Sequence, residues 1–121
     1  MDRQDRLDHE MVATLREMTD VGQPDFLGEL ISLFLDTFAG QLTMLIDRAD
    51  ADDLAGMQRI SHDLKSSSAS VGAVVLAAHC AELEAMSRSG ISRGTVSLVA
   101  RIAEEFREVR PELEALLPTV A

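Results

Sequence analysis

The sequence predicts an all-α fold, an antiparallel up-down four-helix bundle with a short additional N-terminal helix. Apolar residues recur at steps of three and four along five segments of the chain, which is the period of an amphipathic helix. No segment alternates apolar and polar residues as a half-buried strand would. The connections between the segments are short, which favours antiparallel neighbours. A chain of 121 residues is long enough for one core, so we expect residues 1–121 to form a single domain.

The first two helices are predicted from the apolar residues before and after a break at "DVGQPD". A short amphipathic helix is expected from about Asp8 to Thr19, capping one end of the bundle, on the positions Leu7, Met11, Leu15 and Met18. Pro24 is expected in the first turn of the next helix, where its missing N–H costs nothing. That helix should be about 25 residues long, because one apolar stripe continues through Leu27, Leu30, Ile31, Phe34, Phe38, Leu42, Leu45 and Ala49.

Three further helices follow from the second half of the chain. The acidic run "DADD" supplies N-cap candidates for a helix with the stripe Leu54, Met57, Ser61, Leu64, Ser68 and Val71. Gly72 can end or bend this helix, and the next stripe is Leu76, Cys80, Leu83 and Ser87, closing at "SRSGISRG". The last stripe is Val96, Val99, Ile102, Phe106, Val109, Leu113 and Leu116, and Pro111 is expected to kink or interrupt that helix.

The charge and the cysteine content exclude several classes of protein. Eleven basic and 21 acidic residues give a formal net charge of −10, which argues against a nucleic-acid partner or an anionic membrane surface. The polar start "MDRQDRLDHE" has no apolar signal region, and we see no apolar run approaching the length of a membrane span. The single Cys80 cannot form an internal disulfide. We therefore expect a cytoplasmic protein.

The stretch "RISHDLKSSSASVGA" places one histidine in an unusual setting. At about 100° per residue, His62 points away from the apolar stripe of its helix and toward solvent. Lys65 and Ser66 lie one turn on along the same face, Gln58 lies one turn back, and Ala69 lies two turns on. An exposed neutral imidazole could accept a phosphoryl group, with Lys65 offsetting its charge and Ser66 donating a hydrogen bond. The alternative is an ordinary surface histidine beside serines that allow close helix packing.

The same residues resemble a known family. "HDLKSSSASVGA" is similar to the signature of histidine-containing phosphotransfer (HPt) domains, His-x-Leu-Lys-Gly-Ser followed by a Gly-Ala. "FLGELISLFLDTF" resembles the long helix before that signature, and "AAHCAELE" resembles the Cys-x-x-Leu-Glu segment after it. The resemblance implies that His62 accepts the phosphoryl group, that Lys65 assists it, and that Gly72 lets the helix end close to its neighbour.

Two positions leave questions open within this resemblance. Ser66 stands where many members have glycine, and it could either restrict the approach of a partner or donate a hydrogen bond to the phosphoryl oxygens. Glu84 aligns near a position where some relatives carry a polar residue that contacts the site. A carboxylate there would repel a phosphoryl group, so its role is open, as is the ring nitrogen that is phosphorylated.

The resemblance also implies a function. Such domains shuttle a phosphoryl group between receiver-domain aspartates, from a hybrid sensor kinase to a response regulator. They are transfer intermediates with no cofactor and no net turnover, and the sequence has no phosphate-binding loop for ATP. We expect a monomer that docks receivers on the His62 helix and the helix before it, with Gln58 and Ala69 in the docking face. The alternative is a helical-bundle adaptor that binds a receiver or kinase without carrying phosphate.

A metal-binding helical protein is the third reading. His79 and Cys80 are adjacent, but neighbouring residues of a helix point about 100° apart. We therefore expect no metal site, with Cys80 buried as a small hydrophobic residue, His79 structural or solvated, and His9 solvated near carboxylates.

Overall fold

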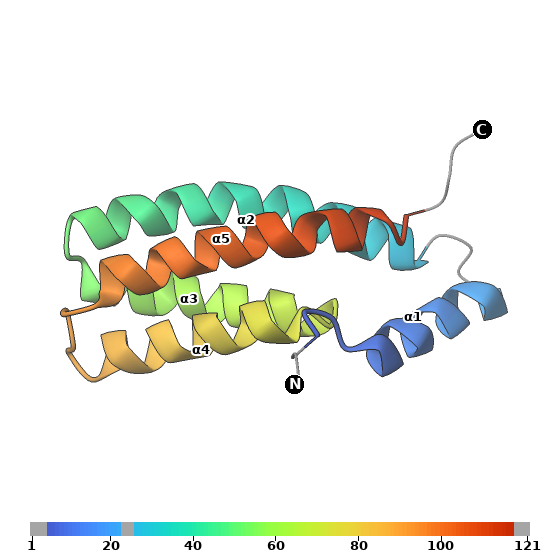
Figure 1. Cartoon of the computed structure of the whole chain (residues 1–121), viewed down its shortest axis with the longest axis horizontal. Helices are drawn as coiled ribbons and strands as arrows, with labels where there is room; N and C mark the ends of the chain where they lie inside the picture. The colour runs from blue at the N-terminus through green and yellow to red at the C-terminus, as the bar shows by residue number, and fades with distance from the viewer. Residues whose placement is uncertain (1–4, 23–25, 118–121) are drawn as a thin grey trace.

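Five helices make up the part of the chain that the computed structural model describes, which is residues 5–22 and 26–117 without the side chains of residues 18–22. They are α1 (His9–Gly22), α2 (Phe26–Asp50), α3 (Leu54–Ser70), α4 (Val74–Arg88) and α5 (Thr95–Glu114). Figure 1 shows α2 to α5 running up and down beside one another, while α1 lies past the ends of α3 and α4. The predicted all-α bundle with an additional N-terminal helix is confirmed.

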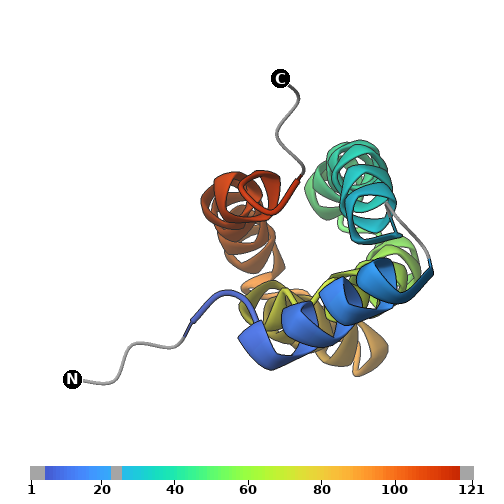
Figure 2. The same cartoon turned by 90° about the vertical axis from the view of Figure 1, so that its right-hand side faces the viewer.

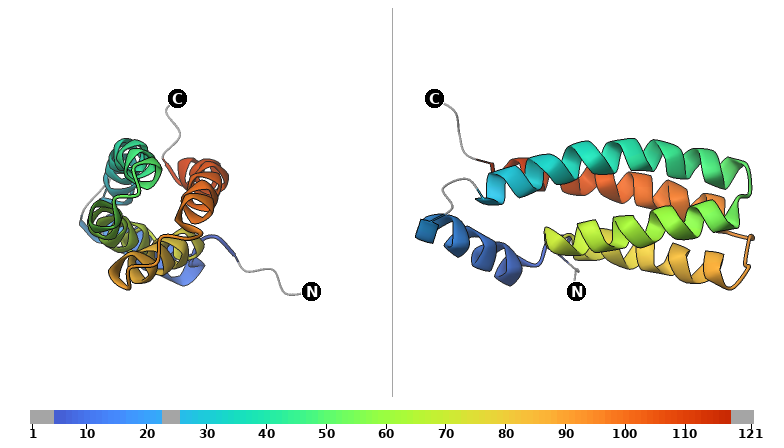
Figure 3. Two further views of the ribbon diagram at one scale, coloured as in Figure 1. Left: turned by 90° about the vertical axis from the view of Figure 1, so that its left-hand side faces the viewer. Right: turned by 180° about the vertical axis from the view of Figure 1, so that it is seen from behind.

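The order of the helices around the bundle decides which faces can meet. The helix α2 packs against α3 and α5, and α4 packs against the same two helices, so the four form a closed ring. Figure 2 shows this ring along the bundle axis, and Figure 3 shows it from the opposite end and from behind. The additional helix α1 contacts α2. Consecutive helices α3 and α4 therefore lie side by side and can build one site between them.

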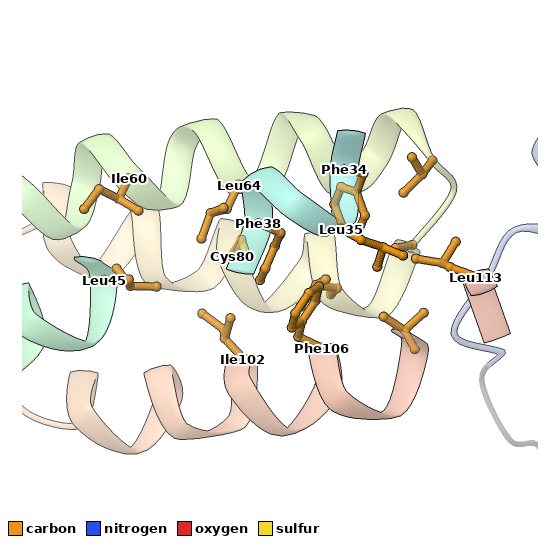
Figure 4. Close-up of a cluster of buried hydrophobic side chains, with 14 of the residues drawn as sticks. Phe34, Leu35, Phe38, Leu45, Ile60, Leu64, Cys80, Ile102, Phe106 and Leu113 are labelled. Carbon is orange, nitrogen blue, oxygen red and sulfur yellow. The ribbon is translucent and has the colours of Figure 1, made fainter. Parts of the chain in front are cut away.

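Most core residues lie on the predicted stripes, and Leu35, Ile60, Ala73 and Leu98 are core residues that those stripes did not include. Figure 4 shows part of this core. The Phe38 ring stacks on Phe106 with centroids 4.5 Å apart, and Phe34 lies 5.3 Å from Phe38. Burying one such side chain contributes about 1.5–3 kcal/mol. Ser61 and Ser68 are also fully buried, as their place on the α3 stripe predicts, and the small side chains suit close packing.

Side chains and a glycine define both ends of α3. Asp53 is the N-cap, and its carboxylate accepts a hydrogen bond from the Gly56 amide at 2.9 Å. At the other end Gly72 has φ +76°, a left-handed conformation that glycine adopts without strain. The Ala73 amide donates to the Ser68 carbonyl and the Gly72 amide donates to the Ala69 carbonyl, which is the Schellman pattern. The helix therefore ends at the position that the sequence predicted.

The segment before α1 differs from the prediction at Leu7. This residue is buried but lies outside the helix, in an isolated bridge with Ala73. The Asp8 amide donates to the Gly72 carbonyl at 2.7 Å, and the Asp8 carboxylate accepts from amides of the first turn of α1. Leu7 thus packs against the α3–α4 turn, and Val12, which was not on the predicted stripe, is buried on α1. The side chain of Met18 and residue Pro24 lie outside the described residues.

The structure corrects two expectations for α5. Pro111 does not interrupt the helix, which continues to Glu114. Because Pro111 and Arg107 are both exposed, water can hydrate the Arg107 carbonyl that loses its intrahelical donor. Val96, predicted to face the core, is 56% exposed, and Thr95 and Leu98 are buried instead. The buried face of the first turn therefore starts one residue earlier than the apolar pattern indicates.

The helix α2 corrects the expectation that no apolar run approaches the length of a membrane span. Among the described helices, it alone is long and apolar enough to cross a membrane by length and composition, with a mean hydropathy of 1.3. A core helix of a soluble protein passes the same test, and one such helix is weak evidence. The exposed residues Leu33, Met44 and Ile46 contribute to this hydropathy, while Ile31, Phe38 and Leu45 of the same helix are buried in the core.

Candidate functional site

The residues predicted for the site lie on the face of α3 that turns away from the core. The His62 side chain is 58% exposed, and Lys65, one turn on, is 37% exposed. Ser66 and Ala69 are exposed along the same face, and Gln58 is half-buried one turn back. Gly72 is buried at the end of the helix. The helical spacing therefore brings the side chains of α3 predicted for the site to one face, while Gly72 lies apart from that face.

Glu84 of α4 joins this face and contacts the side chains of His62 and Lys65. Its carboxylate is buried, with 5% of the side chain exposed. Oε2 lies 2.7 Å from Nδ1 of His62, and Oε1 lies 2.6 Å from Nζ of Lys65. Arg88, four residues on along α4, donates to Oε2 at 2.8 Å. Glu84 is thus the centre of a cluster with three donors from two helices.

The charge of Glu84 is fixed by these contacts. The hydrogen bond from Lys65, followed by that from His62, lowers the pKa of Glu84 from 4.5 to about 2, against the opposing effect of burial. The carboxylate is ionised at neutral pH and can only accept hydrogen bonds. The hydrogen in the contact with His62 must therefore sit on Nδ1, and in the neutral ring this leaves Nε2 with a free lone pair.

This arrangement answers the doubt that the sequence raised about Glu84. A bare carboxylate would repel a phosphoryl group, but this carboxylate is paired with both Lys65 and Arg88. The two cations and the one anion sum to a net charge of +1 beside the His62 ring. Sequence reasoning did not single out Arg88, although its place four residues after Glu84 on one helix was a usable signal.

A depression of about 540 Å³ adjoins His62 on the side of the preceding turns of α3. It is lined by side chains of both helices of the site, which are Ala55, Gln58, Arg59, His62, Asp63 and Glu84. No ion pair of Arg59 is formed with another described residue. The surface around the histidine is therefore hollowed and carries a cation that is free to meet another molecule.

The serine run divides into buried and exposed members. The Ser61 hydroxyl donates to the Met57 carbonyl at 2.6 Å, and the Ser70 hydroxyl donates to the Ser67 carbonyl at 2.7 Å. Within the described range, the Ser66 hydroxyl makes no hydrogen bond to the protein, so it is available at the surface. Close packing explains Ser61 and Ser68, and Ser66 is the exposed serine one turn from His62.

The other histidines and the cysteine lie apart from this cluster. Cys80 is fully buried in the core, and burial raises the pKa of its thiol to about 12. His79 is half-buried beside it, and His9 is exposed with Nε2 3.9 Å from the Asp5 carboxylate. In the part of the chain that the structure describes, no group of three or more His, Cys, Asp or Glu side chains is placed to hold a metal ion.

Comparisons with known proteins agree on one family. The model of the Hpt domain family matches residues 29–117. The chain is 28% identical over 105 residues to histidine-containing phosphotransfer protein 5 of Arabidopsis thaliana, covering 84% of this chain and 67% of that protein. It is 39% identical over 61 residues to phosphorelay protein LuxU of Vibrio cholerae, covering 50% of this chain and 54% of that protein.

Solved structures give the same result for the fold. The crystal structure of histidine-containing phosphotransfer protein B (HptB) from Pseudomonas aeruginosa superposes with a TM-score of 0.83 at 26% identity, covering 93% of this chain and 95% of that one. The histidine-containing phosphotransfer protein ZmHP2 from maize also gives 0.83 at 26% identity, with 92% and 82% covered.

Proposed function

The chain belongs to the Hpt domain family, whose members transfer phosphoryl groups through a histidine in two-component phosphorelays, and from this premise we propose that His62 is its phosphoacceptor. The observation that carries the proposal is the contact of Glu84 with Nδ1 of His62 at 2.7 Å. It holds an exposed imidazole with its Nε2 lone pair directed away from the carboxylate. The nucleophile is therefore Nε2, which is the ring nitrogen that is phosphorylated.

The transfer needs no proton to enter or leave the site. The Nε2 lone pair attacks the phosphorus of a receiver's phosphoaspartate, the N–P bond forms, and the P–O bond breaks to release the aspartate carboxylate. The hydrogen on Nδ1 stays in place, so the phosphorylated ring is cationic and the Glu84 carboxylate stabilises it. In the onward step a second aspartate attacks the phosphorus, the N–P bond breaks, and its electron pair returns to Nε2.

Lys65 supports the phosphoryl group by charge. One of its three N–H donors reaches Glu84, and the remaining two can donate to phosphoryl oxygens. Phosphoryl transfer depends mainly on positioning and on offsetting charge at these oxygens. Ser66, exposed one turn from His62, is placed to donate a further hydrogen bond.

Receiver domains dock on the face formed by α3 and α2. Gln58 and Ala69 flank His62 on α3, and the face continues through Ser67 and Ser70 to a small groove against α2. Across that groove Leu33 is 65% exposed, so this side of the face is apolar. An apolar contact beside a charged centre is the usual composition of a protein interface.

The proposal also covers the oligomeric state, the partners and the location of the protein. It acts as a monomeric transfer intermediate without net turnover, supplied and emptied by the receiver domains of a hybrid sensor kinase and a response regulator. A cytoplasmic location fits its one cysteine, which is free and buried. Light scattering of the purified protein tests the monomer, with a mass near 13.2 kDa expected.

Transfer from a phosphorylated receiver domain tests the site. The chain has three histidines, so His62→Gln is compared with His9→Gln and His79→Gln as matched controls. Radiolabel that is acid-labile and base-stable should appear in the wild type and both controls and be absent from His62→Gln. Label that survives His62→Gln would refute the assignment, and receiver binding without any label would favour the adaptor.

A further inference from the structure

Arg88 is the one member of the Glu84 cluster to which the phosphotransfer mechanism assigns no role. It lies in the last turn of α4 and its side chain is 59% exposed. Its guanidinium donates at 2.8 Å to Oε2 of Glu84, which is the same oxygen that accepts from Nδ1 of His62 at 2.7 Å. Arg88 therefore acts on the atom that holds the histidine.

The number of donors on Glu84 explains why this shared oxygen matters. A carboxylate oxygen has two lone pairs, so Oε2 can accept from His62 and Arg88 together while Oε1 accepts from Lys65. The terminal torsion of a glutamate has a broad energy profile and is set by its hydrogen bonds. With Arg88 in place, donors fix both oxygens. Without it, the carboxylate can turn toward Lys65 and leave Nδ1 without a fixed acceptor.

Arg88 also sets the net charge of the Glu84 cluster. Lys65 and Glu84 alone sum to zero, and Arg88 raises the sum to +1 beside the His62 ring. The whole chain has a formal net charge of −10, so an approaching phosphoryl group meets a generally repulsive field. The Arg88 cation is thus placed close to where the negatively charged phosphoryl group arrives.

We propose that Arg88 is a positioning residue for phosphotransfer: it fixes the Glu84 carboxylate, and through it the ring orientation and the Nδ1–H tautomer of His62, and it leaves the site with a net positive charge. The inference rests on the proposed role of His62. Arg88 itself touches neither Nε2 nor any reacting atom.

The competing explanation is a purely structural role. A cation in the last turn of a helix interacts favourably with the helix dipole, and an Arg four residues after a Glu adds a local ion pair. Both effects would make Arg88 a contributor to the stability of α4 alone. A test must therefore measure a property of the His62 ring that does not change when only the stability of α4 changes.

The substitution Arg88→Met keeps the long aliphatic stem and the helix propensity while removing the charge. Arg107→Met is the matched control, because Arg107 is also exposed and pairs with a glutamate of its own helix, Glu104. Three measurements are made on each full-length protein. They are the ¹⁵N shifts of the His62 ring, the initial rate of phosphorylation by phosphoramidate, and thermal unfolding. Phosphoramidate needs no receiver, because its P–N bond breaks with release of ammonia as the bond to Nε2 forms.

We expect Arg88→Met to convert the single Nδ1–H signature of His62 into a tautomer average and to lower the phosphorylation rate by about tenfold to a hundredfold. Arg107→Met should change neither quantity. An unchanged tautomer in Arg88→Met overturns the proposal, whether or not the rate falls. Label surviving His62→Gln in the receiver assay would instead overturn the proposed function, so the two failures are distinguishable.

Discussion

Replacing Glu84 by glutamine tests the ion pairs of this carboxylate, and the free energy of unfolding is the only quantity that must be measured. The pKa of Glu84 is about 2 in the folded chain against an ordinary value of 4.5, a difference of about 2.5. At about 1.4 kcal/mol for each pKa unit, the ionised carboxylate stabilises the folded state by about 3 kcal/mol at neutral pH. The glutamine side chain has a similar shape but no charge, so most of this contribution should be lost.

The sign of the pH dependence follows from the lowered pKa. Between pH 4.5 and pH 2 the unfolded chain binds more protons at Glu84 than the folded chain does, so stability rises with pH in that interval. The contribution is complete above about pH 5 and is lost as the pH falls toward 2. The difference between wild type and Glu84→Gln should therefore be about 3 kcal/mol at pH 7 and should shrink steadily below pH 5.

Urea denaturation at pH 7, 5 and 3, followed by circular dichroism, measures both quantities. For a denaturant slope of about 1–3 kcal/mol per molar, a loss of about 3 kcal/mol lowers the midpoint at pH 7 by about 1–3 M. Glu82→Gln is the matched control, since Glu82 is exposed on the same helix. A difference below about 1 kcal/mol at pH 7, or one equal at pH 7 and pH 3, would show that Lys65 and His62 do not hold the carboxylate.

Substitutions at three further positions test the packing and the helix ends by the same denaturation experiment. Phe38→Ala removes a buried ring stacked on Phe106 and should lower the free energy of unfolding by about 3–5 kcal/mol; a loss below about 1 kcal/mol would contradict the packing. Gly72→Ala places a side chain at φ +76°, with its Cβ 3.4 Å from the Asp8 carbonyl oxygen, and should cost about 1–2 kcal/mol. Asp53→Ala removes the α3 N-cap and should cost about 1 kcal/mol, whereas Asp53→Asn should keep most of the stability.

The sequence predicted the helices well because each one buries a single stripe. Apolar periodicity located all five helices, and the same geometry placed His62 at the surface and the small residues Ser61 and Ser68 in the core. The errors lie where contacts from outside a helix decide the outcome. Leu7 is apolar at helical spacing but is buried by pairing with Ala73, and the solvent around Pro111 lets α5 continue past it.

Only the part of the candidate site that lies on α3 could be predicted from the sequence. The relation of His62 to Lys65 and Ser66 follows from helical spacing within α3. The relation of His62 to Glu84 spans 22 residues and depends on how α4 packs against α3, which periodicity alone does not determine. For the same reason the sequence suggested that the carboxylate repels phosphate, because its pairing with Lys65 depends on the packing of α3 against α4. Its second counterion, Arg88, lies four residues on along α4 and was a signal that the sequence did offer.

The turn at Gly72 lies between the two halves of the site and sets how they meet. If α4 were shifted by one residue along its sequence, Glu84 would rotate by about 100° around the helix and leave the reach of Nδ1. The Schellman hydrogen bonds and the pairing of Asp8 with Gly72 leave the turn no room for an extra residue. A histidine, a lysine and a serine on α3 are therefore not sufficient for the site. It also requires a tight turn that fixes Glu84 opposite His62, so the proposed site depends on the buried end of α3 as well as on its exposed face.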